Sequence, residues 1–221
     1  MMKERPILFS GAMVHAILDG RKTQTRRPVK GWALDWLQSD NFTPAYVADP
    51  ANRACPYGQA GDRLWVRETF FAFGRWETRF SAKKGRDEWH FVDVTTDSGR
   101  EYQYPDSFAP VASLPREDVT PSWWKRPAIF MPRAASRIVL DIRDVRVERL
   151  NDCSDVDAVA EGLHILPASG RYVVSPGEQY AGLADHDPRV VYADLWDRIN
   201  GAGAWEANPW VWIIEFRRLT P

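Results

Sequence analysis

The sequence predicts an α+β fold, because strand-like and helix-like segments follow one another along the chain with no internal repeat. Three runs rich in apolar and β-branched residues are typical of strands, and three segments carry helical spacing or helix start and stop signals. The chain has 221 residues, of which 44% are hydrophobic. It is therefore long enough to bury a sizeable core as one domain.

The first predicted unit is a strand, a helix and a turn. Residues 6–9 form a short apolar run, and Ser10 is placed to cap a helix expected over 11–19. Gly20 suits the left-handed position that ends a helix. Arg21 and the cations that follow it should therefore lie near the negative end of the helix dipole.

The middle of the chain is less regular, and no pattern is sustained from residue 70 to 132. We expect, in order, loops over 31–60 with a short helix near 33–37, a strand over 64–68, strands of an inserted hairpin at 89–94 and 102–104, and a loop over 106–126.

The last third is better defined. We expect, in order, a strand over 137–142 continued at 145–150, a helix over 155–161 capped by Ser154 with Asp157 near the capping-box position, a loop or lid, a helix begun by Asp187 and Pro188 and ended by Gly201, and a buried strand over 210–216 that closes the sheet.

Composition limits the function classes. The formal net charge is −1, so binding of nucleic acid requires a local basic patch. Two cysteines make neither a disulfide framework nor a zinc site, and the four histidines lack metal-ligand spacing, so we expect no metal or cofactor. With no long apolar run and no signal peptide, the predicted location is the cytoplasm and no membrane partner is expected. Most of the eleven tryptophans should serve packing, while one or two could line a site.

The run from Gly20 to Arg27 is the most informative motif, since it gathers Arg21, Lys22, Arg26 and Arg27. Such a cluster is either a solvated basic turn or a site for an anion or nucleotide. Lys22, if buried beside other cations, would have a lowered pKa and could act as a base. Thr25 offers a hydroxyl that becomes a nucleophile once a neighbour removes its proton.

Four carboxylates are candidates to meet this run: Asp62, Glu68, Glu161 and Glu215. Each also has a purely structural interpretation, as a turn residue, an arginine partner or a helix end. Spacing alone leaves these alternatives open. Arg133, just before a predicted strand, adds a further cation.

Residues 20–27 resemble the Gly-x-Lys-x-x-[Glu/Thr]-x-Arg signature of ASCH domains, relatives of the PUA fold. Residues 61–66 resemble that family's turn and following strand, and 212–216 its closing strand. Over its length the chain is similar to longer ASCH-like proteins of phages and prophages. The resemblance implies a PUA-like β-barrel flanked by helices, as a single domain over 1–221 with an insertion at 70–130 and a loop or lid at 163–187.

The resemblance also implies a function. ASCH-like proteins bind RNA or nucleotides beside the signature, and one branch is an amidohydrolase acting on N4-acetylcytidine through Lys, Thr and Glu. This implies catalytic roles for Lys22, Thr25 and Glu161, with Glu161 matched by a short Glu-Gly pair. The candidate contacts to substrate or nucleic acid are Arg21, Arg26, Arg27, Asp62, Glu68 and Arg133.

Three functions remain open from the sequence. The first is the amidohydrolase, acting on a nucleoside, a nucleotide or a strand. The second is a non-catalytic module that binds RNA or a modified base. The third is a phage protein that assembles with, or takes over, another protein through the inserted segment.

Overall fold

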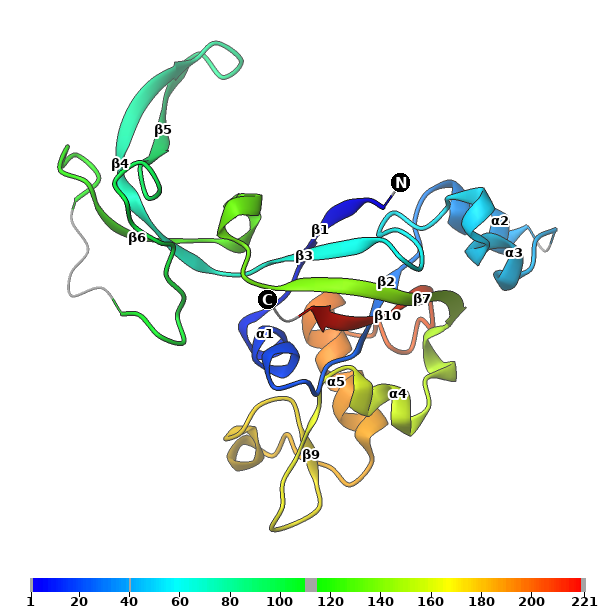
Figure 1. Ribbon diagram of the computed structural model, residues 1–221. Coiled ribbons are helices and arrows are strands. Elements are labelled where there is room, and N and C mark those ends of the chain that lie inside the picture. Colours follow the sequence, from blue (N-terminus) through cyan, green and yellow to red (C-terminus); the bar gives the residue numbers. More distant parts are fainter. Residues whose placement is uncertain (1, 40, 110–114, 220–221) are drawn as a thin grey trace. The chain divides into compact units, whose positions relative to one another are not determined.

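The structure is a computed structural model that describes residues 2–39, 41–109 and 115–219. It confirms the predicted α+β class, since sheets and helices are both present (Figure 1). The chain forms two compact units: unit 1 comprises the residues up to Val66 and from Ile138 onward, and unit 2 comprises Arg67–Arg137. The segment expected as an insertion, 70–130, thus falls within unit 2.

Unit 1 is built on one five-stranded sheet with the order β1-β3-β7-β10-β2. These strands are β1 (Glu4–Leu8), β2 (Gln24–Pro28), β3 (Arg63–Arg67), β7 (Val139–Arg149) and β10 (Trp210–Leu219). Strand β10 pairs antiparallel with β2 on one side and β7 on the other, placing Ile214 between Thr25 and Val145. The predicted burial of this strand is confirmed, but β10 lies inside the sheet rather than at its edge, because its backbone is hydrogen-bonded to a neighbour on each side.

The five-stranded sheet is strongly curled. Strands β1 and β2 are its first and last members, yet the Arg27 guanidinium donates to the Leu8 carbonyl oxygen at 2.7 Å. In a flat sheet these strands would be about 19 Å apart, well beyond the reach of one side chain. Phe9, just after β1, lies with its ring centroid 6.3 Å from that of Phe216 on β10. Curling therefore encloses the apolar core of unit 1.

Among the described residues of unit 1, the α-helices are α1 (Gly11–Leu18), α2 (Trp32–Gln38), α3 (Pro44–Ala48), α4 (Asp155–Ala160) and α5 (Pro188–Asn200). Figure 1 shows α1, α4 and α5 grouped beside β2 and β10. Ser154 caps α4 through the predicted capping box with Asp157, and Asp187 caps α5. Ser10 precedes α1 as predicted, but its side chain makes no capping hydrogen bond.

Short 3₁₀ turns join these elements at Pro50–Asn52, Leu150–Asp152 and Glu178–Ala181. The segment expected as a loop or lid, 163–187, also contains a small hairpin of β8 (His164–Ile165) and β9 (Tyr172–Val173). Val173 is fully buried. This segment is therefore anchored to the core of unit 1.

Unit 2 contains a three-stranded sheet with the order β5-β4-β6. Its strands are β4 (Phe70–Ser81), β5 (Arg86–Asp93) and β6 (Ser122–Arg126), and 3₁₀ turns follow at Ala128–Phe130 and Arg133–Ala135. A separate small core gathers Phe70, Ala72, Met131 and Ala135.

The predicted partners within this unit are wrong. The strand expected at 89–94 pairs with β4, whereas the segment 102–104 supplies a single bridge between Gln103 and Phe71. The loop expected over 106–126 contains β6, and its residues 110–114 lie outside the described residues. The long β4 escapes prediction because aromatic and charged residues follow one another in it without simple alternation.

Gly74 allows β4 to lie close to its neighbouring strand β5. A Cβ at this position would lie 2.1 Å from the carbonyl oxygen of Val92 on β5, closer than any real contact. The Gly74 carbonyl in turn accepts from the indole of Trp124 on β6 at 3.0 Å. Only a glycine allows this close approach of the two strands.

No helix among the described residues is long and apolar enough to cross a membrane. Within the same residues, no group of three or more histidine, cysteine or acidic side chains is arranged to hold a metal ion. Cys55 and Cys153 are both free thiols, and burial raises the pKa of Cys55 to about 11 and that of Cys153 to about 12.

Candidate functional site

The signature run leaves α1 and turns inward before it enters β2. Gly20 adopts a φ of 75°, which ends the helix as predicted, and the amides of Arg21 and Lys22 both donate to the carbonyl of Ala16. Lys22 then forms an isolated β-bridge with Glu161. The lysine side chain is consequently carried into the interior, where only 2% of the residue is exposed.

Lys22 and Glu161 form a buried ion pair. The Lys22 Nζ lies 2.7 Å from Glu161 Oε2 and also donates to the Glu161 carbonyl at 2.9 Å. Gly162 makes this approach possible: its φ is 106°, and a Cβ there would lie 3.0 Å from the Cβ of Lys22. The Glu-Gly pair matched by resemblance therefore has a steric reason in this fold.

Arg26 is the second cation on Glu161. Its Nη1 donates to Glu161 Oε1 at 3.2 Å, while its Nη2 lies 3.5 Å from Asp157 Oδ2. The Arg26 side chain is fully buried, and its Nε and Nη2 have no hydrogen-bond partner among the described residues. A buried guanidinium with unused donors is suited to receive an anionic or carbonyl oxygen.

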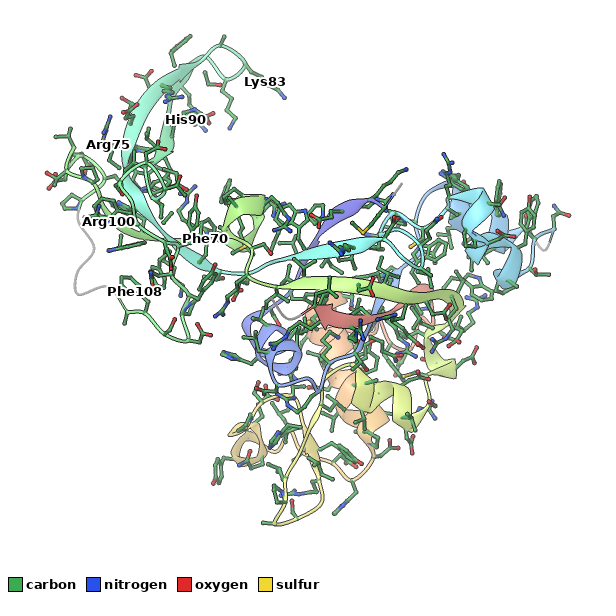
Figure 2. The ribbon with its side chains drawn as sticks, viewed as in Figure 1. Phe70, Arg75, Lys83, His90, Arg100 and Phe108 are labelled. Carbon is green, nitrogen blue, oxygen red and sulfur yellow. The ribbon has the colours of Figure 1, made fainter. Side chains whose placement is uncertain are left out.

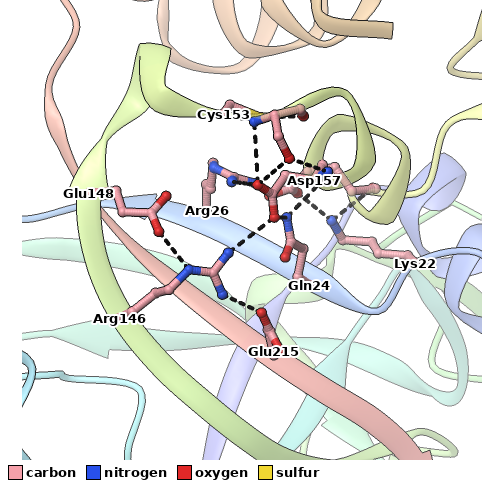
Figure 3. Close-up of polar contacts among 10 residues, drawn as sticks. Lys22, Gln24, Arg26, Arg146, Glu148, Cys153, Asp157 and Glu215 are labelled. Atoms are coloured by element: carbon pink, nitrogen blue, oxygen red, sulfur yellow. Dashed lines mark hydrogen bonds and ion pairs between the residues drawn. The ribbon is translucent and has the colours of Figure 1, made fainter.

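A ring of polar groups supports this centre (Figure 3). Gln24 donates to the Asp157 carbonyl and carboxylate at 3.0 Å, and Arg146 donates to the same carboxylate at 3.0 Å. Arg146 also binds Glu148 and Glu215. Asp157, in the first turn of α4, is thereby tied to β2 and to β7.

The pKa of Lys22 is lowered. Burial is the main cause, the carboxylate of Glu161 opposes it, and the charges of Arg27 and Arg26 add to the lowering. The pKa of Tyr192 is raised well above its ordinary value, first by burial and then by the Glu161 carboxylate. Lys22 therefore loses its proton more easily than an ordinary lysine, whereas Tyr192 keeps its own.

Thr25 and Glu161 line the same small cavity, of about 20 Å³, together with Arg26 and Tyr192. Trp196 and the last residues of α5 complete its wall. Thr25 is 2% exposed. This volume holds about one water molecule, so the cavity is closed to anything as large as a nucleobase.

The remaining cations of the signature have structural partners. Arg21 donates to the Gly162 carbonyl and pairs with Asp19 at 2.9 Å. Arg27 binds the Leu8 carbonyl and lies over the ring of Phe9, 5.2 Å from its centroid. Both side chains hold the loop and the curled sheet around the site.

Three predicted contact residues belong to other places. Asp62 accepts from the Lys3 amide at 2.8 Å and from Arg5 at 3.0 Å, at the edge of a separate cavity of about 440 Å³. Glu68 lies in unit 2, where it holds Arg137 through two hydrogen bonds of 2.9 and 3.0 Å. Arg133 lies in a 3₁₀ turn of unit 2.

No pattern in the sequence marks Tyr192 as a site residue, and Asp157 carries only the capping-box signal. Tyr192 lies on the buried face of α5, where a tyrosine is expected to be a core residue. Asp157 carries the capping-box signal, which explains its hydrogen bond to Ser154 but not its contact with Arg26. Neither position has a local signal for the site, because both reach it through tertiary packing.

No protein-family model matches the chain, and no curated protein or solved structure is significantly similar to it.

Proposed function

We propose that the protein is a nucleotide- or nucleic-acid-directed hydrolase of the ASCH type that removes the acyl group from N4-acylated cytosine. The observation that carries this proposal is the buried Glu161 carboxylate, which binds both Lys22 and Arg26 and lines one small cavity with Arg26 and Thr25. Replacing a buried ion pair by apolar residues is often neutral or stabilising. A buried, charged cluster with a lowered lysine pKa therefore favours a chemical role.

The fold supports the ASCH reading. The hydrogen bond from the Arg27 side chain to the Leu8 carbonyl joins the first and last strands of the five-stranded sheet, as expected for a PUA-like barrel. Helices α1, α4 and α5 beside β2 and β10 agree with a barrel flanked by helices (Figure 1). With Cys55 and Cys153 as free thiols, we place the protein in a reducing cytoplasm, that of the host if a phage encodes it.

The proposed reaction begins with the neutral fraction of Lys22, which takes the Thr25 hydroxyl proton. The Thr25 Oγ1 then attacks the acyl carbonyl carbon, and the carbon–nitrogen bond to N4 breaks as the nitrogen receives the proton from Lys22. Water hydrolyses the resulting Thr25 ester with Lys22 again as base, releasing a carboxylate. Glu161 holds Lys22 in place throughout and orients the exocyclic amine.

Arg26 is the best candidate to stabilise the oxyanion of the tetrahedral intermediate. Arg26 lines the cavity together with Thr25, and its Nε and Nη2 have no hydrogen-bond partner among the described residues. Arg27 is less suited, because its guanidinium is engaged by the Leu8 carbonyl. Fixed donors at a buried oxyanion contribute about 10²–10³ in rate.

The closed cavity means that substrate entry requires a movement. Trp196, Ile199 and Asn200, at the end of α5, form part of its wall, and Gly201 ends that helix. Displacement of this last turn would open the cavity without moving its other walls, which belong to β2, to Met13 of α1, to Tyr192 and to Glu161.

The decisive experiment incubates the purified protein with N4-acetylcytidine, its monophosphate and acetylated RNA, and follows loss of the acetyl group by mass spectrometry. We expect Thr25→Val to abolish turnover and Thr25→Ser to retain it, because only the valine lacks a hydroxyl. Thr23→Val is the matched control, since Thr23 is an exposed threonine of the same run. The rate should rise with pH towards the lowered pKa of Lys22 and level off below 10.5.

A second candidate is a binding module without chemistry. Two observations favour it: two hydrogen bonds hold Lys22 to Glu161, and the cavity is closed. Both are typical of an ion pair with a purely structural role. In that case none of the three substrates loses its acetyl group, while acetylated RNA still binds with an affinity that falls with salt. The Thr25→Val variant then binds this RNA with the affinity of the wild type. Turnover that survives Thr25→Val would reject the hydrolase mechanism.

A further inference from the structure

The end of the β4–β5 hairpin in unit 2 is a two-stranded ribbon with two different faces. Strand β6 pairs with β4 from Phe70 to Gly74, and from there to Ser81 the register of β4 continues with β5. Partners in an antiparallel pair lie on the same face of the sheet, so the register assigns each side chain of the ribbon to a face.

One face of the ribbon is a row of aromatic rings. Trp76 pairs with Phe91, with ring centroids 5.4 Å apart, and Trp89 stands beside Thr78 one step further along. Phe80 follows near the turn. Phe80 is 69% exposed and Trp89 38% exposed, so the row emerges from the small core of unit 2 into solvent.

Cations lie at both ends of this row. At its inner end Arg126 lies over Trp76 and Phe91, 4.8 and 4.3 Å from the ring centroids, and Arg116 lies over Trp76 at 4.6 Å. At the outer end the turn carries two exposed lysines, Lys84 and Lys83, the latter labelled in Figure 2.

The opposite face is polar and largely paired with itself. Arg75 and Arg79 both bind Glu77, and Glu88 accepts from Lys84 at 2.6 Å. The register puts two carboxylates on the aromatic face, Asp87 beside Phe80 and Asp93 beside Gly74, and Asp93 accepts from Thr95 and Tyr102. The aromatic face therefore combines exposed rings with cations at its two ends.

We propose that this face binds single-stranded nucleic acid, its bases stacked on Phe80 and Trp89 and its phosphates paired with Lys83 and the arginines at the inner end. Side chains on one face of a strand recur about every 6.8 Å, a spacing an extended strand can match with one base per ring. A duplex hides its base faces, so it gains the charge contacts but not the stacking.

This surface goes beyond the proposed hydrolysis, because the ribbon binds a strand whether or not Thr25 reacts. If both proposals hold, the natural substrate is an acylated strand rather than a free nucleoside. A protein partner for the same exposed rings is the competing occupant.

The test measures anisotropy of a labelled oligouridylate with the full-length protein, with a duplex of equal length for comparison. We expect Phe80→Ala and Trp89→Ala each to weaken single-strand binding by about tenfold. Tyr180→Ala is the matched control, since Tyr180 is a 90% exposed aromatic of unit 1. Lys83→Ala should reduce the salt slope of log Kd by about 0.7. Phe80, being largely exposed, can be changed without loss of the fold, which circular dichroism verifies.

Equal binding of duplex and single strand, or affinities that ignore Phe80→Ala, would overturn the proposal. Oligouridylate carries no acyl group, so its binding reports on the ribbon alone, and a failed hydrolase assay is distinguished from a ribbon that does not bind. A protein captured through Phe80 and Trp89, with no affinity for oligouridylate, would assign the surface to the other occupant.

Discussion

At the scale of single residues, the centre of unit 1 depends on how one carboxylate is shared. Glu161 receives Lys22 on one oxygen and Arg26 on the other, and all three side chains are almost wholly buried. Two cations on one anion leave an excess positive charge, which Asp157 offsets from 3.5 Å. The arrangement favours loss of a proton from Lys22, because Arg26 and Arg27 stay protonated and their charges lower the lysine pKa.

We predict that Lys22→Met destabilises unit 1 by about 3–5 kcal/mol in urea unfolding, because it removes one partner of a buried pair and leaves part of the Glu161 charge uncompensated. Adding Glu161→Gln to that variant should restore part of the loss. A double variant as unstable as the sum of the two single variants would show that the pair is not coupled.

The same lysine gives a pH signature. Because its folded pKa lies below 10.5, unfolding takes up a proton between the two values, and the free energy of unfolding rises with pH across that window. Lys22→Met should lack this rise.

At the scale of elements, helix α4 is held to the sheet by one carboxylate. Asp157 closes the capping box with Ser154 and accepts from Gln24 on β2 and Arg146 on β7. Desolvation raises the pKa of Asp157, but the hydrogen bonds from Ser154 and Gln24 and the charge of Arg26 outweigh it and lower the pKa to about 2. A six-residue helix has little stability of its own, so these contacts fix its position.

We predict that the stability supplied by Asp157 is complete above its ordinary pKa of 3.8 and is lost as the pH falls to about 2. Asp157→Asn should therefore lower the urea midpoint at neutral pH and flatten its dependence on pH across this acid range. Asp155→Asn is the matched control, an exposed aspartate in the same first turn. An unchanged acid transition in Asp157→Asn would contradict the assigned role.

At the scale of the whole molecule, unit 2 interrupts a hairpin of unit 1. Strands β3 and β7 pair antiparallel up to Trp65 and Val139, and the Val66 amide donates to the Ile138 carbonyl at 2.9 Å. The chain thus leaves unit 1 and returns to it at neighbouring positions. Each unit has its own buried core.

We predict that replacing residues 67–137 by an Asn-Gly turn leaves unit 1 folded, because a two-residue turn joins antiparallel neighbours without strain. Circular dichroism and a cooperative urea transition would verify the fold. The shortened chain should keep any Thr25-dependent turnover on free N4-acetylcytidine and lose binding of oligouridylate. Collapse of unit 1 would show that its fold needs unit 2.

Local patterns in the sequence set most of the elements of unit 1, since helical spacing, caps and terminal glycines act over a few residues. The helix after Ser10, the capping box at Ser154 and the proline start of α5 are confirmed for this reason. The resemblance of residues 20–27 likewise directs attention to Lys22 and Thr25.

Long-range packing decided the rest. The contact of Lys22 with Glu161 joins residues 139 positions apart, which no local spacing encodes. Long-range packing likewise brings Tyr192 to the site and holds Asp62 and Glu68 elsewhere, with Arg5 and Arg137 as their partners. The strands that pair with β10 and β4 could not be predicted either. The backbone groups at a strand's edge form hydrogen bonds with whichever strand the fold places beside them, and the local sequence does not specify which strand that is.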